Sequence, residues 1–426
     1  MIQKIIHTVG SRAVTVLFNL MLLFITTRWM GAENKGLISL FVLNLSVASI
    51  LSGLFGGPSL VYLAPRFSSK ALITINYSWA ILVSVGLTCL LFFTSLPLSI
   101  PPLYFGLLAI LECITAVNLM MLLGKNKVKE HNWLQIIKVF ITVVVLFVDY
   151  SFQELSFESF VRAYGISLII TSVASIVLMV RNKRITLEKT PFKIILKEAL
   201  KYGSLVQIGS IAQLLNYRLS YYILELLISP PSVALIRIGI FHTSVQVAEA
   251  LWQFAKSIGT VQYATVSNLR NRNEGLRISL KLAKLNYSVT GLGVLILLLI
   301  PANFYSQVLG SEFGEIKAHL YYLAPGIFIL SISNAFSHFF AGVGDHRFNT
   351  YSSVFGLILT CLLIYPSIIM FGTYGAALAA STVYCLQTIY QYWHMYSKDG
   401  VHIKHLLLTI DDFAEFKVIG TKLIKR

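Results

Sequence analysis

Long apolar runs alternate with short polar stretches along the whole 426-residue chain. A helix needs about 20 apolar residues to cross a bilayer core about 30 Å thick, and most of the runs reach that length. Turn-forming residues such as Met30-Gly31 and Pro101-Pro102 separate several of them. The pattern predicts about twelve membrane-spanning helices, at 9–30, 36–63, 71–98, 101–124, 133–150, 160–181, 203–229, 233–262, 282–308, 319–342, 350–371 and 373–395.

The basic residues between these runs fall mostly on alternate connections. If the N-terminus is cytoplasmic, 26 of the 34 lysines and arginines lie on the cytoplasmic side, five lie on the other side, and three lie inside predicted helices. Cytoplasmic loops carry the excess of Lys and Arg in membrane proteins. We therefore expect a multi-pass protein of the inner (cytoplasmic) membrane with both termini in the cytoplasm.

The most basic connection between helices, at 181–202, follows the sixth predicted helix. We expect it to separate an N-terminal lobe of six helices (1–190) from a C-terminal lobe of six helices (191–396). The tail, 397–426, mixes apolar residues such as Leu406 and Phe413 with charged residues such as Lys417. This mixture is typical of an amphipathic helix at the cytoplasmic interface, and a frayed basic tail is the alternative. The predicted fold is all-α and polytopic.

The composition indicates a lipid environment and argues against several functions. Hydrophobic residues make up 56% of the chain and charged residues 12%, against roughly 25% charged in soluble domains, and the mean hydropathy is +0.75. The net charge of +16 does not indicate a nucleic-acid partner, because the basic residues lie in short loops between apolar runs. The four cysteines lie inside apolar runs without metal-ligand spacing, so we expect neither a metal site nor a disulfide framework.

Ionisable side chains inside the predicted helices concentrate in the seventh and eighth. Arg218 and Glu225 lie in the seventh. The eighth carries five polar residues at spacings of three or four, which places them on one helical face: His242, Gln246, Glu249, Gln253 and Lys256. Charges within a bilayer cost about 2.5–3.5 kcal/mol each on insertion scales and tend to face a water-filled cavity. We expect such a cavity in the second half of the chain.

Two interpretations of these charges stay open. Arg218 and Glu249 lie at matching depths, and an ion pair that only joins two helices is the alternative to a cavity site. Glu112, alone in the fourth helix, either faces the cavity or hydrogen-bonds a neighbouring helix. Lys138 lies near the predicted start of its helix, so we expect its ammonium to reach the interface.

Sequence motifs favour transport over catalysis. Gly342-Val343-Gly344 lacks the third glycine of a nucleotide fingerprint and has no βαβ context. The chain has no Walker A lysine motif, and its short external loops offer no extracytoplasmic site of the kind that a membrane polysaccharide polymerase needs. We therefore expect a protein that is not an enzyme and has no cofactor.

Three short motifs follow one another along the chain. The stretch 27–37, TRWMGAENKGL, resembles the junction after the first helix in the Wzx-type branch of the multidrug/oligosaccharidyl-lipid/polysaccharide (MOP) exporter superfamily. The stretch 215–219, LNYRL, resembles the seventh-helix motif, although Ser220 stands where an aspartate is frequent. The stretch 372–379, GTYGAALA, resembles the turn into the last helix. The resemblance covers nearly the whole chain.

This resemblance implies two six-helix lobes around a cavity that opens alternately to each side. It implies an undecaprenyl-pyrophosphate-linked oligosaccharide as the substrate, such as an O-antigen unit of lipopolysaccharide, flipped to the outer leaflet, with polysaccharide polymerases and glycosyltransferases as partners beside the membrane lipid. Arg218 matches the family motif, so it is expected to meet the pyrophosphate. Lys256 and Arg12 are assigned to the same cavity by their helix positions alone.

The acidic residues inside the helices depart from a purely cationic cavity. Glu112, Glu225 and Glu249 balance the basic groups and leave room for coupling to H⁺ or Na⁺, with His242, Gln246 and Gln253 as further polar candidates. A small-molecule or multidrug antiporter of the same superfamily is the alternative function. A membrane polysaccharide polymerase is the third.

Overall fold

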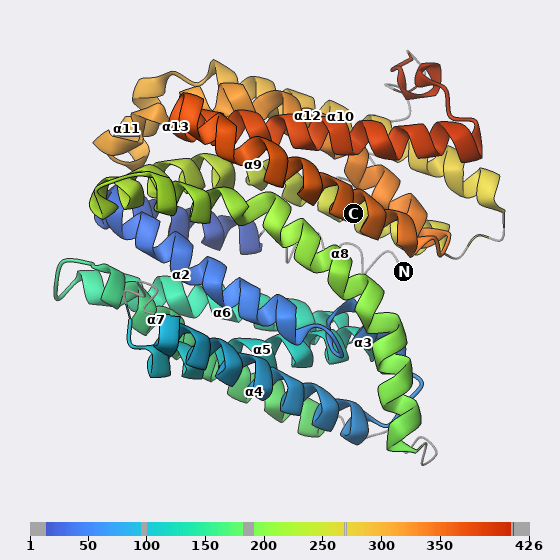
Figure 1. Cartoon of the computed structure of the whole chain (residues 1–426), viewed down its shortest axis with the longest axis horizontal. Coiled ribbons are helices and arrows are strands. Elements are labelled where there is room, and N and C mark those ends of the chain that lie inside the picture. The colour runs from blue at the N-terminus through green and yellow to red at the C-terminus, as the bar shows by residue number, and fades with distance from the viewer. Residues whose placement is uncertain are drawn as a thin grey trace. The chain divides into compact units, whose positions relative to one another are not determined.

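The computed structural model describes residues 14–94, 100–125, 127–181, 191–267, 269, 271–409 and 412. Helices make up nearly all of this part (Figure 1). The first helix, Val14–Trp29, ends in a π-helical turn, η1 (Ile25–Trp29). It is followed by α2 (Gly31–Ser52), α3 (Gly57–Leu63), α4 (Ser69–Thr94), α5 (Pro102–Gly124), α6 (Val128–Tyr150), α7 (Phe157–Arg181), α8 (Phe192–Leu227), α9 (Pro231–Val266), α10 (Arg272–Leu299), α11 (Ala302–Leu309), η2 (Ser311–Glu315), α12 (Ile316–Gly342), α13 (His346–Asp399) and η3 (Ile403–Leu406).

Eight helices of the described chain are long and apolar enough to cross a membrane: α2, α4, α5, α6, α7, α10, α12 and α13. The last of these counts twice, because Gly372 (φ 58°, ψ −135°) interrupts α13 and divides it into two helices. The first helix is shorter, and α8 and α9, each 36 residues long, lack a stretch of spanning length that is equally apolar and equally free of charges. Together these reach the predicted twelve, and the prediction of an all-α, polytopic membrane fold is confirmed.

Two predicted helices are interrupted. The predicted span 36–63 breaks after Ser52, and α3 begins at Gly57. The sequence between them is rich in glycine. At the end of α2, the Ile50 carbonyl accepts one hydrogen bond from the backbone N–H of Gly53 at 2.9 Å and a second from Nε2 of Gln207 of α8 at 2.7 Å. The predicted span 282–308 breaks at Pro301, where the ring and the missing N–H cannot continue α10.

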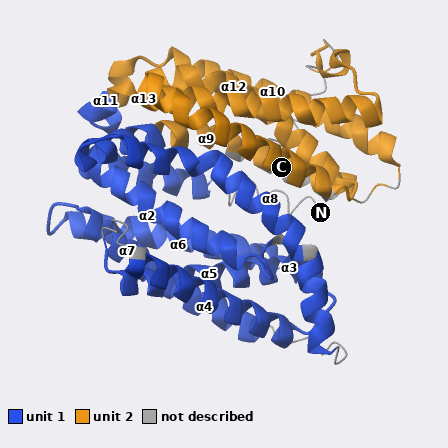
Figure 2. Cartoon of the chain, in the orientation of Figure 1, with its two compact units in different colours: residues 1–243, 306–313 blue, residues 244–305, 314–426 orange. Residues whose placement is uncertain are grey.

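The chain forms two compact units (Figure 2). Unit 1 comprises Met1–Thr243 and Ser306–Phe313, and unit 2 comprises Ser244–Tyr305 and Gly314–Arg426. The boundary in this division falls within α9 and not in the basic connection at 181–202. The division of the topology into two six-helix lobes stays a prediction.

Helix α5 is central to unit 1, where it contacts α2, α3, α4, α6 and α7. Two clusters of buried apolar side chains surround it, one including Phe41, Phe105 and Phe160 and the other including Met121 and Leu134. These clusters fix the positions of the helices that carry the polar side chains of unit 1, since close-packed interiors leave little freedom for shifts.

In unit 2, α12 packs between α10 and α13 around the buried Phe336, Phe339 and Phe340. Gly400 (φ 65°) ends α13, and the chain then turns back onto α10, where Tyr287 donates a hydrogen bond to the Leu406 carbonyl at 2.6 Å. The prediction of one amphipathic helix over 397–426 is therefore wrong for 400–409, because that segment is bound to α10 as an extended stretch with one 3₁₀ turn. Residues 413–426 lie outside the described part.

Candidate functional site

Helices α2 and α9 approach each other closely in unit 1 because two glycines meet at the crossing. A Cβ atom on Gly36 would lie 2.1 Å from the carbonyl oxygen of Leu235, and one on Gly239 would lie 2.1 Å from the carbonyl oxygen of Ala32. Small residues permit such backbone contact between membrane helices. The crossing sets the distance between the two polar residues next to it, Lys35 on α2 and His242 on α9.

Lys35 is a buried cation. It directly precedes the predicted helix 36–63, and the sequence interpretation therefore counted it among the five basic residues of the external connections. Its side chain is 3% exposed, and Nζ donates a hydrogen bond to Oγ1 of Thr26 at 3.0 Å. The Thr26 hydroxyl in turn donates to the Leu22 carbonyl at 2.8 Å. The expectation for Lys35 was wrong because α2 already begins at Gly31, which brings the lysine into the packed first turns of the helix.

Arg218 of α8 reaches the same region. Its Nη1 atom donates a hydrogen bond to the hydroxyl of Tyr221 at 2.9 Å, and the fully buried Tyr221 ring lies 5.3 Å from the ring of His242. The charges of both Arg218 and Lys35 act on that imidazole. The Nδ1 atom of His242 is buried and has no hydrogen-bond partner among the described residues. We call Lys35, Arg218 and His242 the basic cluster.

Glu225 does not belong to this cluster but lines a cavity of about 200 Å³ in unit 1. The walls come mainly from apolar side chains of α2, α7 and α9, and Asn44 is the other polar residue of the lining. Tyr222 donates a hydrogen bond to Oδ1 of Asn44 at 2.6 Å. The cavity thus combines one carboxylate with a mostly apolar surface.

The remaining predicted residues of α9 lie in unit 2. Oε1 of Gln246 is buried and has no hydrogen-bond partner within the described residues, Glu249 is half-buried, and Lys256 is exposed. Because Arg218 lies in unit 1 and Glu249 in unit 2, their pairing stays a prediction. Two further predicted positions, Arg12 and the side chain of Gln253, lie outside the described part.

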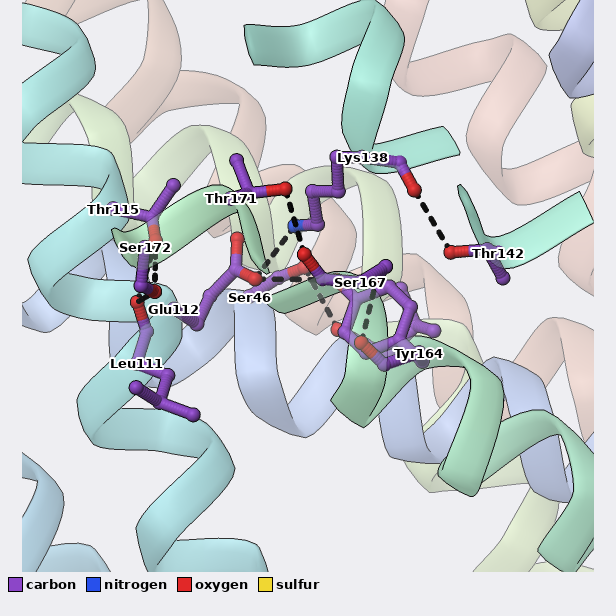
Figure 3. A network of polar contacts seen from close by, with 11 residues as sticks. Ser46, Leu111, Glu112, Thr115, Lys138, Thr142, Tyr164, Ser167, Thr171 and Ser172 are labelled. Carbon is purple, nitrogen blue, oxygen red and sulfur yellow. Dashed lines mark hydrogen bonds and ion pairs between the residues drawn. The ribbon is translucent and has the colours of Figure 1, made fainter. Parts of the chain in front are cut away.

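A second polar network joins α5, α6 and α7 in the middle of unit 1 (Figure 3). Nζ of Lys138 lies 2.6 Å from Oε2 of Glu112, and the hydroxyl of Tyr164 donates to the same oxygen at 3.2 Å. The ammonium also lies 4.8 Å from the centre of the Tyr164 ring. Beside this group, the hydroxyls of Thr115 and Ser172 are 2.7 Å apart.

The interfacial position expected for Lys138 is wrong. Helix α6 begins at Val128, five residues before its predicted start, so Lys138 lies about 15 Å along the helix at 1.5 Å per residue. At that depth its ammonium cannot easily reach the interface and instead contacts Glu112. The structure therefore places Glu112 in a contact between helices, while its part in ion coupling stays a prediction. Within the described chain, no three His, Cys, Asp or Glu side chains are grouped to hold a metal ion.

No protein-family model matches the sequence, and no curated protein matches it. Several solved structures are similar to this chain. A multidrug resistance MATE family transporter of the MOP superfamily, in an inward-facing conformation, is 12% identical over 90% of this chain and 94% of its own, with a TM-score of 0.70. Lipid II flippase MurJ, in an inward closed conformation, is 15% identical over 99% of this chain and 93% of its own, with a TM-score of 0.68.

A MOP superfamily transporter from Pyrococcus furiosus Vc1 (DSM3638) is 13% identical over 93% of this chain and 94% of its own, with a TM-score of 0.65. It is described as having a binding pocket of reverse polarity that suggests a different function. At these identities the likeness establishes the fold alone. The chain has the fold of MATE transporters and of MurJ, which are transporters and flippases and not enzymes, and it is a multi-pass membrane protein.

Proposed function

We propose that the chain is a flippase that moves a pyrophosphate-linked lipid oligosaccharide from the cytoplasmic to the outer leaflet of the inner membrane by alternating access. The observation that carries this proposal is the basic cluster. Lys35, Arg218 and His242 come from three helices of unit 1, and the charges of Lys35 and Arg218 both lie close enough to influence the His242 imidazole in the interior of a membrane protein. The MOP fold supplies the transport architecture, and MurJ, with the same fold, is a lipid II flippase.

The chemistry of the cluster suits a pyrophosphate. A guanidinium can bind phosphate oxygens through two parallel hydrogen bonds, and Arg218 presents that group beside the buried Tyr221. A buried ammonium such as that of Lys35 is costly unless an anion or polar partner offsets it, and Thr26 provides a single neutral oxygen. Nδ1 of His242 adds a ring nitrogen that is open to a further hydrogen bond.

Several finer points belong to the same proposal. Lys256 and Arg12 would meet the substrate at other stages of its passage, and H⁺ or Na⁺ would drive the cycle through carboxylates of the helices. Both termini would lie in the cytoplasm, as the distribution of basic loops indicates. Glycosyltransferases would supply the substrate, and a polysaccharide polymerase would consume it.

A small-molecule or multidrug antiporter is the second candidate, and the Glu225 cavity favours it. A volume of about 200 Å³ with one carboxylate and mostly apolar walls would suit a small lipophilic cation better than an oligosaccharide. Survival of an expressing strain on cationic drugs tests this candidate. Drug resistance that depends on Glu225 and is unaffected by Arg218→Ala would favour the antiporter.

The flippase is tested with Arg218→Ala and Arg218→Lys in a strain that depends on this chain for polysaccharide export. Loss of a charged hydrogen bond, about 1.5–3 kcal/mol, predicts roughly 10- to 150-fold weaker binding of a labelled undecaprenyl-pyrophosphate sugar to Arg218→Ala. Lysine should recover only part of the affinity, because it binds phosphate as a point charge. The matched control is Arg162→Ala, which removes a half-exposed arginine paired with Asp149 at 2.7 Å.

Export and binding at the wild-type level in Arg218→Ala, in protein that inserts normally, would refute the role given to Arg218. Normal behaviour of Lys35→Met in the same two assays would refute the basic cluster as the substrate site. Reduced export in Arg162→Ala would show that the assay reports general damage.

A further inference from the structure

The Glu112 network lies deep in the apolar part of unit 1 and holds two opposite charges in direct contact. Glu112 is ten residues into α5, and Lys138 is ten residues into α6. Their side chains are only 17% and 20% exposed, and Nζ and Oε2 are 2.6 Å apart. Figure 3 shows Lys138 and Tyr164 converging on Glu112 from different helices. An ion pair at this depth is far from both helix ends.

The groups around Glu112 are those that would hold a small cation. A carboxylate oxygen and a phenolic oxygen meet at one point, and oxygen ligands of this kind suit hard cations such as Na⁺. A proton on the carboxylate would be an equivalent way of neutralising the charge. In the structure neither is needed, because the ammonium of Lys138 provides the positive charge at hydrogen-bond distance from the carboxylate.

The titratable groups that the structure places next to Glu112 are Lys138 on α6, Tyr164 on α7 and Cys113 beside it on α5. Tyr164 has contacts with both charges, since its hydroxyl donates to Oε2 of Glu112 and its ring lies under the ammonium. Lys138 is thus held on two sides. Three helices are joined through a pair that loses its balance of charge if either member is removed.

We propose that Glu112 and Tyr164 form a latent site for a monovalent cation, Na⁺ or H⁺, and that Lys138 occupies it as a tethered counter-ion. In the wild-type protein this site therefore exchanges no free cation while the pair is closed. Removal of the ammonium opens the site and makes the protein bind Na⁺ or a proton at Glu112. This proposal concerns ion binding and holds whether the cargo is a lipid-linked sugar or a drug.

The test uses the purified full-length protein in detergent and compares wild type, Lys138→Met, Lys138→Arg and the double variant Glu112→Gln/Lys138→Met. Binding of radioactive Na⁺ is measured at constant ionic strength with choline as the replacing cation, and thermal unfolding is followed from pH 5 to pH 8. Sodium sites elsewhere in the molecule cancel in the comparison. Lys138→Met should bind about one Na⁺ more than wild type, or should gain stability from acid, through ordinary linkage.

The two other variants identify the cause. Lys138→Arg keeps a tethered cation and should behave as wild type, while the double variant lacks the carboxylate and should lose the gained Na⁺ or pH dependence. Equal ion binding and equal pH profiles in Lys138→Met and the double variant would overturn the proposal, as would a gain in Lys138→Arg as large as that in Lys138→Met.

Lys138→Met leaves a carboxylate without its counter-ion and is the variant at risk of failing to fold. Purification is therefore done in parallel with Na⁺ and choline buffers, each at pH 5.5 and pH 7.5. If Lys138→Met does not fold in choline buffer at pH 7.5, we expect it to be recovered in folded form only with Na⁺ or acid. The double variant should be recovered under all four conditions. Failure of Lys138→Met under all four conditions, while the double variant folds, would contradict a latent cation site. The flippase assay with Arg218 is unaffected by either outcome.

Discussion

The crossing of α2 and α9 predicts that even the small change of Gly36 to alanine strains the contact between the two helices. The added Cβ would lie 2.1 Å from the carbonyl oxygen of Leu235, whereas ordinary contact begins at 3.4 Å, so the helices would have to separate by about 1.3 Å. The atoms that it meets belong to the backbone, and no change of a neighbouring side chain can relieve the clash. Overpacking of this kind typically costs about 1–3 kcal/mol.

The higher helix propensity of alanine offsets part of this steric cost. It favours a helix interior over glycine by about 1 kcal/mol, so Gly36→Ala is expected to destabilise the protein by about 0–2 kcal/mol. Gly86 of α4 is the matched control, because a Cβ there meets nothing within 4 Å, and Gly86→Ala should stabilise by up to about 1 kcal/mol. The difference between the two variants, about 1–3 kcal/mol, isolates the steric term.

The assay is thermal unfolding in detergent, followed by tryptophan fluorescence, together with the export assay. One kcal/mol shifts Tm by about 2–4 °C in proteins of 150–250 residues, and a chain of this size lies at or below the lower end. Gly36→Ala should melt below Gly86→Ala and export less, because Lys35 and His242 move apart with the helices. Equal Tm changes of the same sign in both variants would refute a close backbone crossing.

Two further predictions concern a kink and the tail. Gly372→Ala should destabilise the protein by about 1–3 kcal/mol and so lower Tm, because its φ of 58° and ψ of −135° are strained for a residue with a Cβ. The strain comes from the backbone alone, since the structure leaves room for the Cβ. Burial alone would raise the pKa of Asp412, but hydrogen bonds from Lys284 and Thr409 outweigh it and lower the pKa to about 2. A carboxyl group with a depressed pKa contributes stability above its ordinary pKa, and this stability is lost as the pH falls toward the pKa of the folded state. The tail should therefore detach from α10 between about pH 4 and pH 2, and the fluorescence anisotropy of a dye attached to Leu408→Cys should drop over that range. In Lys284→Ala the anisotropy should be low already at neutral pH.

Helix number and fold class could be predicted from the sequence because a bilayer fixes the length of an apolar run. The break inside the predicted helix 36–63 could not be, whereas the break at Gly372 coincides with the predicted boundary between 350–371 and 373–395. The Ile50 carbonyl beside the first break accepts a hydrogen bond from Gln207, more than 150 residues away in the chain. The positions of helix starts were uncertain for the same reason, since polar first turns such as those of α2 and α6 resemble loops.

The predicted positions of the helix starts determined how many residues of the site could be predicted from the sequence. The sequence indicates Arg218, Glu225 and His242 because they lie far inside long apolar runs. The sequence does not indicate Lys35, because a lysine near Gly31 resembles a loop residue. No feature of the sequence identifies Thr26 as its hydrogen-bond partner. Lys138 was assigned to an interface because its predicted helix began five residues late. In both cases the error concerned a lysine, whose long stem allows either location.

The π-helical turn at Ile25–Trp29 has a consequence for how relatives of this chain should be aligned. Such a turn is a local bulge within an α-helix, and its second residue, Thr26, accepts the hydrogen bond of Lys35. A homologue one residue shorter here would have a regular helix, and everything before the deletion would be rotated by about 100°. We therefore expect a single gap at this point in an alignment to accompany the loss of the threonine's contact with the buried lysine.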